Sequence, residues 1–186
     1  MGGEFEHGPE QEDRFRSMFQ NHFQPIHLYV RRRVLSDEDA GDLVADVFTA
    51  AWRRIDQVPE PPEDLLWLYG TARRTISEHR RSTLRRRRLS DRLKLVRDIE
   101  PALPHPEDSG HDAMLHAVSR LRPDDAEALR LVLWDELSHA EAAVVLECSV
   151  NAVGIRVHRA KQRLRAQLRY GLPPDDAPVP TANPVD

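Results

Sequence analysis

The sequence predicts an all-α protein with two small helical domains joined by a flexible acidic linker, the C-terminal domain being a helix-turn-helix. Several segments carry apolar residues at every third or fourth position, which is the spacing of an amphipathic helix. Residues 98–111 contain three prolines and several acids, a composition that favours a flexible linker. The expected order is a disordered N-terminus at 1–13, a helical domain at 14–97, the linker, a helical domain at 112–170, and a disordered Pro-rich tail at 171–186.

The first helical segment is expected to begin at Arg14 and to reach Val34, with apolar residues at helical spacing. Pro25 lies inside it, and proline removes a backbone donor and clashes with the preceding turn. The pattern therefore predicts two helical pieces or one kinked helix.

A second helix is predicted after Ser36, which can cap its N-terminus, because acids follow where the helix dipole favours them. Its apolar positions, from Ala40 to Ile55, have near-ideal helical spacing. Three acids three or four residues apart share one side of it, namely Asp39, Asp42 and Asp46. A core stripe with a solvated acidic face explains most of this pattern. An acidic rim around Phe48 and Trp52 would also suit docking onto a basic protein surface.

Prolines 59, 61 and 62 predict a loop, and a third helix is expected from about Glu63 to Arg81. This helix mixes aromatic residues with cations: Trp67, Tyr69, Arg73, Arg74, His79, Arg80 and Arg81. Aromatic rings can stack on unpaired bases while arginines hold the phosphate backbone. In the alternative, Trp67 is a core residue and the arginines are solvated. This alternative explains Trp67 alone as well as DNA binding does, but it explains the whole set less well.

In the C-terminal half, helices are predicted at 112–121 and 124–136, with Pro123 suited to the first turn of the second. Ser138 can cap a short helix that ends at Leu146, and Glu147, Cys148 and Ser149 form a turn. The next helix opens at Ser149 or Val150 and carries one apolar stripe: Val150, Val153, Val157, Ala160, Leu164 and Leu168. Its other faces carry arginines and no acid, which suits a DNA major groove better than the alternative of an ordinary hairpin with a solvated basic face.

Composition argues against several other classes of protein. The formal net charge of −4 conceals basic and acidic blocks, which point to different partners for different faces. One cysteine excludes an internal disulfide, and the absence of a signal peptide or a bilayer-length apolar run predicts a cytoplasmic protein without membrane insertion. We expect no enzyme, metal or cofactor. The loose group of His105, His111 and His116 lies in and beside the linker, where coordination geometry cannot be fixed.

Two motifs in the chain resemble bacterial RNA polymerase sigma factors. Residues 39–48, with the sequence DAGDLVADVF, and residues 67–74, with the sequence WLYGTARR, are similar to the second conserved region of that family. Residues 148–153 and 157–160 are similar to its fourth region. The short acidic linker, with no intervening third domain, resembles the extracytoplasmic-function class, and the likeness covers roughly residues 15–168.

The resemblance implies partners and roles. The partners are core RNA polymerase, contacted at its β′ clamp and β flap, promoter DNA, and an anti-sigma factor. Polymerase docking falls on the helix that carries Asp39, Asp42, Leu43, Asp46, Val47, Phe48 and Trp52. Unpaired minus-10 DNA would be held by the proline-containing loop and the helix after it, through Gln57, Trp67, Tyr69, Arg73, Arg74, Arg80 and Arg81. Duplex minus-35 DNA would be read by Asn151, Ala152, Ile155, Arg156, His158, Arg159 and Arg163.

The chain departs from the family at three positions. Gly154 and Ile155 replace a basic and a small polar residue, and Arg74 stands where asparagine is frequent. The competing interpretation is a one-component helix-turn-helix regulator without polymerase docking, which has no need of the acidic helix or of the arginine-aromatic helix. An RNA-binding adaptor that uses Arg85 to Arg88 is a weaker one, because a run of four arginines is generic.

Overall fold

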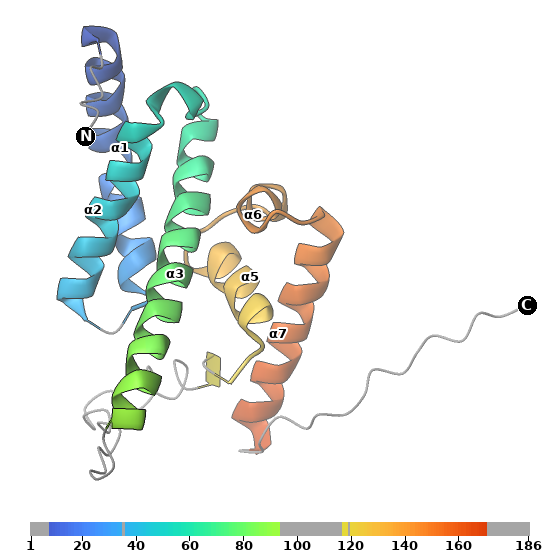
Figure 1. Cartoon of the computed structure of the whole chain (residues 1–186). Coiled ribbons are helices and arrows are strands. Elements are labelled where there is room, and N and C mark those ends of the chain that lie inside the picture. The colour runs from blue at the N-terminus through green and yellow to red at the C-terminus, as the bar shows by residue number, and fades with distance from the viewer. Residues whose placement is uncertain (1–7, 35, 94–116, 119, 171–186) are drawn as a thin grey trace, which may run out of the picture.

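The computed structural model describes residues 8–34, 36–93, 117–118 and 120–170, and over these ranges the chain forms helices and no strand (Figure 1). Among the described residues, the N-terminal domain has three helices and one short 3-10 turn, and the C-terminal domain has three helices besides the two helical residues at 117 and 118. The elements are α1 (Pro9–Arg31), α2 (Asp37–Arg53), η1 (Ile55–Gln57), α3 (Glu63–Leu93), α5 (Pro123–Leu133), α6 (His139–Leu146) and α7 (Val150–Tyr170). The predicted all-α class is therefore confirmed.

Helix α1 begins at Pro9, so the prediction of a disordered segment up to residue 13 is wrong for its last five residues. Pro9 occupies the first helical turn, where its missing donor costs nothing, and Gln11 accepts from the backbone N–H of Gly8. The helix also continues through Pro25 as one element. The expected division into two pieces does not occur, because the apolar stripe of α1 is buried on both sides of the proline, at Met18 and at Ile26.

Helix α2 begins as predicted, with the Ser36 hydroxyl accepting from the backbone N–H of Asp39 at 3.3 Å. Helices α1, α2 and α3 pack on one another around a shared apolar core. Its fully buried side chains include Ile26, Val30, Val47, Ile55 and Leu68. Helix α3 extends to Leu93, beyond the end expected near Arg81.

The C-terminal domain has the predicted helix-turn-helix at α6 and α7. Ser138 and Glu141 form a reciprocal capping box, with hydrogen bonds of 3.2 and 2.8 Å, and the turn spans residues 147–149 as expected. Helix α5 packs on α7, and Pro123 lies in its first turn. Val150, which was expected in the buried stripe, is half exposed because it opens α7 at the outer edge of the turn.

Four predictions lie wholly or partly outside the described residues: the N-terminus at its residues 1–7, the linker at 98–111, the histidine group in and beside it, and the tail at 171–186. Of the expected helix at 112–121, residues 117 and 118 are described, and they are helical. Within the described ranges, no group of metal-ligating side chains gathers and no helix could cross a membrane.

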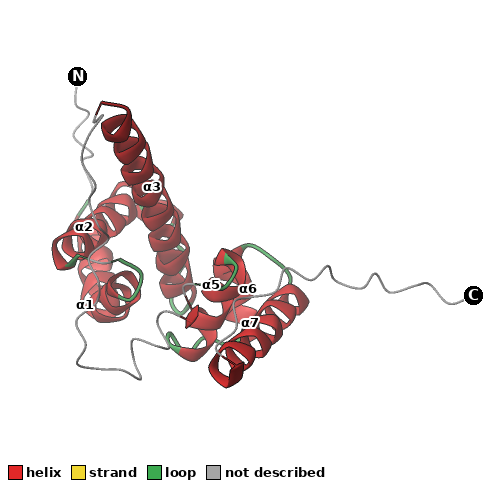
Figure 2. Ribbon diagram, turned by 90° about the horizontal axis from the view of Figure 1, so that it is seen from below, coloured by secondary structure: helices red, strands yellow, loops and turns green. Residues whose placement is uncertain are grey.

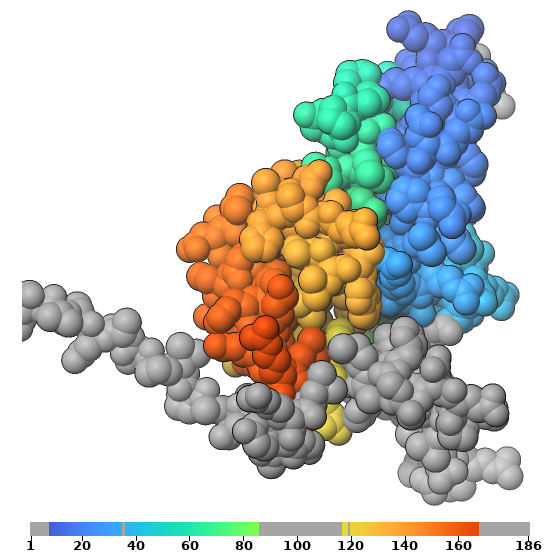
Figure 3. Space-filling model, turned by 180° about the vertical axis from the view of Figure 1, so that it is seen from behind, coloured from blue at the N-terminus to red at the C-terminus, as the bar shows by residue number. Residues whose placement is uncertain are grey.

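The C-terminal domain lies against α3, as the view from below shows, and hydrogen bonds from Tyr29 and Arg33 join it to the end of α1 (Figure 2). Seen from behind, the space-filling surface of α5 and α6 continues directly into that of α1 and α3 (Figure 3). The two domains are therefore in contact, and this contact decides which of the faces predicted to bind DNA are open to solvent.

Candidate protein- and DNA-binding surfaces

The outer face of α2 is acidic and open to solvent. Asp42 and Asp46 are exposed, with Gly41, Ala45 and Thr49 beside them. Neither aspartate forms an ion pair with a described residue. Asp39 lies at the start of the same face, half-buried, with its carboxylate 3.8 Å from His79 Nε2 of α3. A free pair of carboxylates on a rigid helix can bind a basic surface of another protein.

Three apolar residues that were predicted to contact polymerase lie in the core instead. Leu43, Val47 and Phe48 are buried, because this stripe of α2 faces α1 and α3. They support the acidic face from beneath and cannot touch a partner while the domain is folded. Trp52 is half-buried at the edge, with its ring centroid 5.1 Å from that of Phe15.

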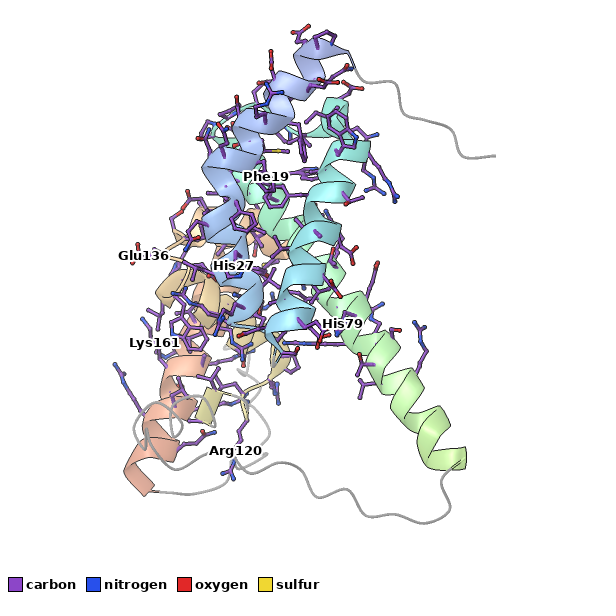
Figure 4. The ribbon with its side chains drawn as sticks, turned by 90° about the vertical axis from the view of Figure 1, so that its left-hand side faces the viewer. Phe19, His27, His79, Arg120, Glu136 and Lys161 are labelled. Atoms are coloured by element: carbon purple, nitrogen blue, oxygen red, sulfur yellow. The ribbon has the colours of Figure 1, made fainter. Side chains whose placement is uncertain are left out.

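Exposed aromatic surface lies instead on α1, where the sequence reasoning did not look for it. Phe19 and Phe23 are 39% and 38% exposed, and the ring of Phe19 packs edge-on against Phe48, with centroids 4.8 Å apart (Figure 4). The signal was present, since Phe15, Phe19 and Phe23 recur every four residues and so share one face of the helix. The acidic face of α2 therefore has aromatic neighbours, but they come from α1.

The aromatic residues of α3 divide between the core and its edge. Tyr69, which was predicted to meet unpaired bases, is buried with its ring 5.1 Å from that of Tyr29, so this assignment is corrected. Burial raises the pKa of Tyr69 to about 12. Trp67 is half-buried and packs against the core, while Gln57 in η1 is exposed. Of Gln57, Trp67 and Tyr69, only the first two therefore have a side chain open to solvent.

The predicted arginines of α3 face the C-terminal domain. Arg74 forms an ion pair with Glu147 of the helix-turn-helix turn at 2.8 Å, and Arg80 donates to the backbone carbonyl of Arg33 at 2.7 Å. Arg73 and Arg81 line a cavity of about 460 Å³ between α1, α3 and α5. The four arginines therefore line one side of α3, beside another part of the same chain.

A buried ionic group joins the two domains next to this cavity; we call its members, Tyr29, Arg33, Glu127 and Asp135, the Arg33 cluster. The Arg33 guanidinium donates to Glu127 at 3.0 Å and to Asp135 at 2.7 Å, and the Tyr29 hydroxyl donates to Glu127 at 2.8 Å. The guanidinium carbon also lies 3.5 Å from the centroid of the Tyr29 ring. Sequence reasoning missed this cluster entirely.

Burial governs the protonation of the Arg33 cluster. It raises the pKa of Tyr29 well above the ordinary value, and it raises the pKa of Asp135 even though Arg33 acts in the opposite direction. Burial acts to lower the pKa of Arg33, but Tyr29, Glu127 and Asp135 together hold it above the ordinary value. The arginine is therefore charged, and both of its carboxylate partners come from the other domain.

The outer face of α7 carries the exposed residues of the predicted duplex reader. Asn151, Ile155, His158 and Arg159 are exposed and Ala152 is half-buried, on the side opposite the buried stripe of Val153 and Val157. Gln162 is exposed on the same face and was missed, although its spacing from Ile155, His158 and Arg159 indicated it. Arg159 forms no ion pair with any described residue, so its charge is free for a phosphate.

Two predicted DNA contacts on α7 point elsewhere. Arg163 donates to Asp125 of α5 at 3.2 Å. Arg156 lies 3.7 Å from Asp124 and donates to Cys148 Sγ at 3.6 Å. Both occupy the flank of α7 that faces α5, because the acids of the first turn of α5 attract them. The outer face of α7 is therefore formed without Arg156 and Arg163.

The sequence matches two family models in the order expected. Sigma-70 region 2 matches residues 18–88, and Sigma-70, region 4 matches residues 111–164. The chain is 30% identical to the ECF RNA polymerase sigma factor BldN of Streptomyces coelicolor, over 89% of this chain and 62% of that protein. It is 28% identical to the RNA polymerase sigma factor NccH of Alcaligenes xylosoxydans xylosoxydans, over 83% and 87%. The chain thus spans less than two thirds of BldN but most of NccH.

Solved structures have the same fold. The sigma factor RpoE of Bartonella quintana, in complex with the anti-sigma factor NepR, superposes with a TM-score of 0.66 at 24% identity, over 84% of this chain and 97% of that one. CnrH, in complex with the cytosolic domain of CnrY, gives 0.59 at 23% identity, over 83% and 86%. With both conserved regions present in sequence and in fold, the chain belongs to the extracytoplasmic-function class of RNA polymerase sigma factors.

Proposed function

We propose that the chain directs core RNA polymerase to promoters, with the N-terminal domain holding the enzyme and the opened minus-10 DNA, and the C-terminal domain reading the minus-35 duplex. The observation that carries this proposal is the pairing of a free acidic face on α2 with a free polar and basic face on α7. The protein would carry no catalysis of its own and would act in the cytoplasm, where polymerase and promoter DNA lie.

Polymerase docking is assigned to Asp42 and Asp46, with Asp39 at the edge of the face and Phe19 beside it. The decisive experiment is capture of purified core polymerase by the chain and by its Asp46→Arg variant. Since Asp46 is exposed and unpaired among the described residues, the variant should fold normally and lose capture. Glu10→Arg, at an exposed acid on α1, is the matched control and should retain it.

Two results would count against this assignment. Equal capture by wild type and Asp46→Arg would remove α2 as the docking face. Failure of wild type to capture polymerase, with duplex binding intact, would support a regulator that binds DNA alone.

Minus-10 binding is assigned to Gln57, Trp67 and the arginines of α3, and minus-35 reading to Asn151, Ala152, Ile155, His158 and Arg159 on α7. Aromatic stacking contributes about 1–3 kcal/mol per base, so Trp67→Ala should weaken single-stranded binding by about ten-fold or more. Because the helix-turn-helix is untouched, duplex binding should be unchanged. Fluorescence anisotropy with single-stranded and duplex minus-35 probes separates the two, and an equal loss on both probes would indicate misfolding.

We further propose that an anti-sigma factor covers the acidic face of α2. Two of the similar solved structures are complexes of this kind, RpoE with NepR and CnrH with the cytosolic domain of CnrY. A candidate inhibitor should compete with core polymerase for the chain, and Asp46→Arg should weaken both interactions. An inhibitor that binds without displacing polymerase would refute the shared face.

A further inference from the structure

One side chain of α1 holds the connecting loop that leads from α2 to α3, residues 54–62. The guanidinium of Arg14 donates to the backbone carbonyl of Ile55 at 2.9 Å and to that of Pro59 at 3.2 Å. It also donates to the carbonyl of Val58. Three carbonyls of the connecting loop therefore converge on a single group from a helix that is distant in sequence.

The connecting loop has few backbone donors with which to fix its own shape. Its positions 59, 61 and 62 are prolines, which have no N–H group. An arginine supplies several donors in a rigid planar fork, whereas a lysine ammonium is a compact charge on a flexible stem. The guanidinium also lies 3.0 Å from the carboxylate of Glu60, which is exposed. Arg14 thus supplies the hydrogen bonds that a regular turn would form within itself.

Two further contacts from α1 fix the ends of the connection. His22 Nε2 lies 2.8 Å from Asp64 Oδ2 in the first turn of α3, and the two side chains are 16% and 6% exposed. Gln11 donates to the Asp56 carboxylate in η1 at 3.1 Å. Helix α1 is itself anchored in the core by Met18, which lies between these contacts. The connection is therefore attached to a rigid support from η1 to the start of α3.

These contacts fix the place of Gln57 without touching its side chain. Ile55 and Val58, whose carbonyls accept from Arg14, are buried, while Gln57 between them is exposed. A side chain that is positioned before binding loses less conformational freedom on binding. If only about a tenth of the molecules kept the loop in its binding conformation, the apparent affinity would fall about ten-fold.

We propose that Arg14 is a positioning residue of the minus-10 site, which holds the connecting loop so that Gln57 meets an unpaired base. The inference rests on the proposed minus-10 role of Gln57, but the attachment of the loop to Arg14 does not depend on that role. Arg14 acts through the loop and not through DNA, because its guanidinium is engaged by the carbonyls and by Glu60.

Hydrogen exchange of the loop amides tests this attachment in the full chain without DNA. The N–H groups of Gln57 and Val58 donate to carbonyls of the same segment at 2.7 and 3.3 Å, so their exchange reports its opening. Arg14→Lys keeps the charge but loses the fork, and it should speed this exchange by about ten-fold. Arg16→Ala is the matched control and should leave the exchange unchanged, because Arg16 is exposed on the same helix and pairs with Asp13 there.

The second readout is base discrimination by the holoenzyme that the chain forms with core polymerase. Selection from a random pool of single-stranded oligonucleotides gives the sequence that wild type prefers, and anisotropy with its single-base variants locates the position at which Gln57→Ala removes the preference. Arg14→Lys and Arg14→Ala should reduce the preference at that position by about ten-fold. Adding Gln57→Ala to either should cause no further loss, because both changes disable one site.

Three controls separate positioning from misfolding and from a direct charge effect. Arg16→Ala should keep the base preference. Polymerase capture and minus-35 duplex binding should be unchanged in every variant, a result that an unfolded chain would not give. Full discrimination by Arg14→Lys, with loss in Arg14→Ala alone, would show that the charge suffices and would overturn the role of the fork.

The remaining outcomes are equally decisive. Unchanged loop exchange in both Arg14 variants would overturn the attachment itself. Faster exchange with full base discrimination would make Arg14 a structural residue and overturn its positioning role. If Gln57→Ala removes no preference while Arg14→Lys speeds exchange, the minus-10 role of Gln57 fails and the attachment stands, so the two proposals are distinguished.

Discussion

Arg159 and Arg163 lie one helical turn apart on α7, and the structure predicts opposite consequences for their removal. Arg159 is exposed and forms no ion pair with a described residue, so we expect it to contact a phosphate. Arg163 donates to Asp125 of α5 at 3.2 Å, and the side chain of that aspartate is 5% exposed. Arg159→Ala should therefore impair DNA binding alone, and Arg163→Ala should impair stability.

The magnitudes follow from these two environments. Each phosphate contact contributes about 0.9 to the slope of log K against log salt on duplex DNA. Loss of one contact should therefore make the difference in affinity between wild type and Arg159→Ala shrink about 3.5-fold between roughly 50 and 200 mM salt. Arg163→Ala leaves a buried carboxylate without its partner, which costs about 1–3 kcal/mol of unfolding free energy.

Both quantities can be measured on the same preparations. Anisotropy titrations with a minus-35 duplex and a scrambled duplex, at several salt concentrations, give the slopes, and thermal unfolding followed by circular dichroism gives the stability. Arg159→Ala should weaken both duplexes nearly equally and unfold like wild type. A wild-type salt slope for Arg159→Ala, or a reduced slope with unchanged stability for Arg163→Ala, would refute the division of α7 into these two flanks.

Three further predictions concern local structure. Gly154→Ala should raise the free energy of unfolding by up to about 1 kcal/mol in denaturant titrations, since glycine is unfavourable inside a helix. A β-carbon at this position would meet only His139 Nδ1, at 3.9 Å, so there is room for it, and a loss of stability would contradict the prediction. Ser138→Ala should lower the free energy of unfolding by about 1 kcal/mol, and an unchanged melting temperature would contradict the cap. The hydrogen bonds with Ser138 lower the pKa of Glu141, so the stability that Glu141 contributes should be present at neutral pH and be lost as the pH falls below the ordinary range of that carboxyl. Tyr69, with its pKa raised to about 12, should stabilise the fold below pH 10 and lose that contribution between pH 10 and 12; ultraviolet titration against Tyr69→Phe would refute this by finding ordinary ionisation near 10.

Local signals made the helices predictable. The caps at Ser36 and Ser138 and the early proline at 123 mark helix starts by satisfying or removing backbone donors, which is a property of a few adjacent residues. At Pro25, of the two expected alternatives, the division into two pieces does not occur, because tertiary packing outweighs a local breaker when the helix is buried on both sides of it. The prediction of disorder at residues 9–13 was wrong, because α1 already begins at Pro9.

The predicted sites were less accurate because a helical wheel shows which residues share a face but not what that face meets. Leu43 and Val47 share a helix with the acids of α2 but lie on the opposite, buried side. Arg156 and Arg163 carry the same charge as Arg159, and only the position of Asp124 and Asp125 on α5 separates them from it. Such partners are distant in sequence, so no pattern within α7 could reveal them.

The chemistry of the domain contact also bears on how easily it opens. Tyr29, Arg33, Glu127 and Asp135 give up hydration when the domains close, and the raised pKa of Asp135 shows that its desolvation outweighs the attraction of Arg33. When the domains separate, these polar groups regain their hydration. An apolar contact of equal size would instead expose apolar surface to water, at a free-energy cost of about 25 cal/mol per Å². Acidification should therefore not open the protein by way of Asp135, since the closed form binds the proton of that carboxyl more tightly than the open form.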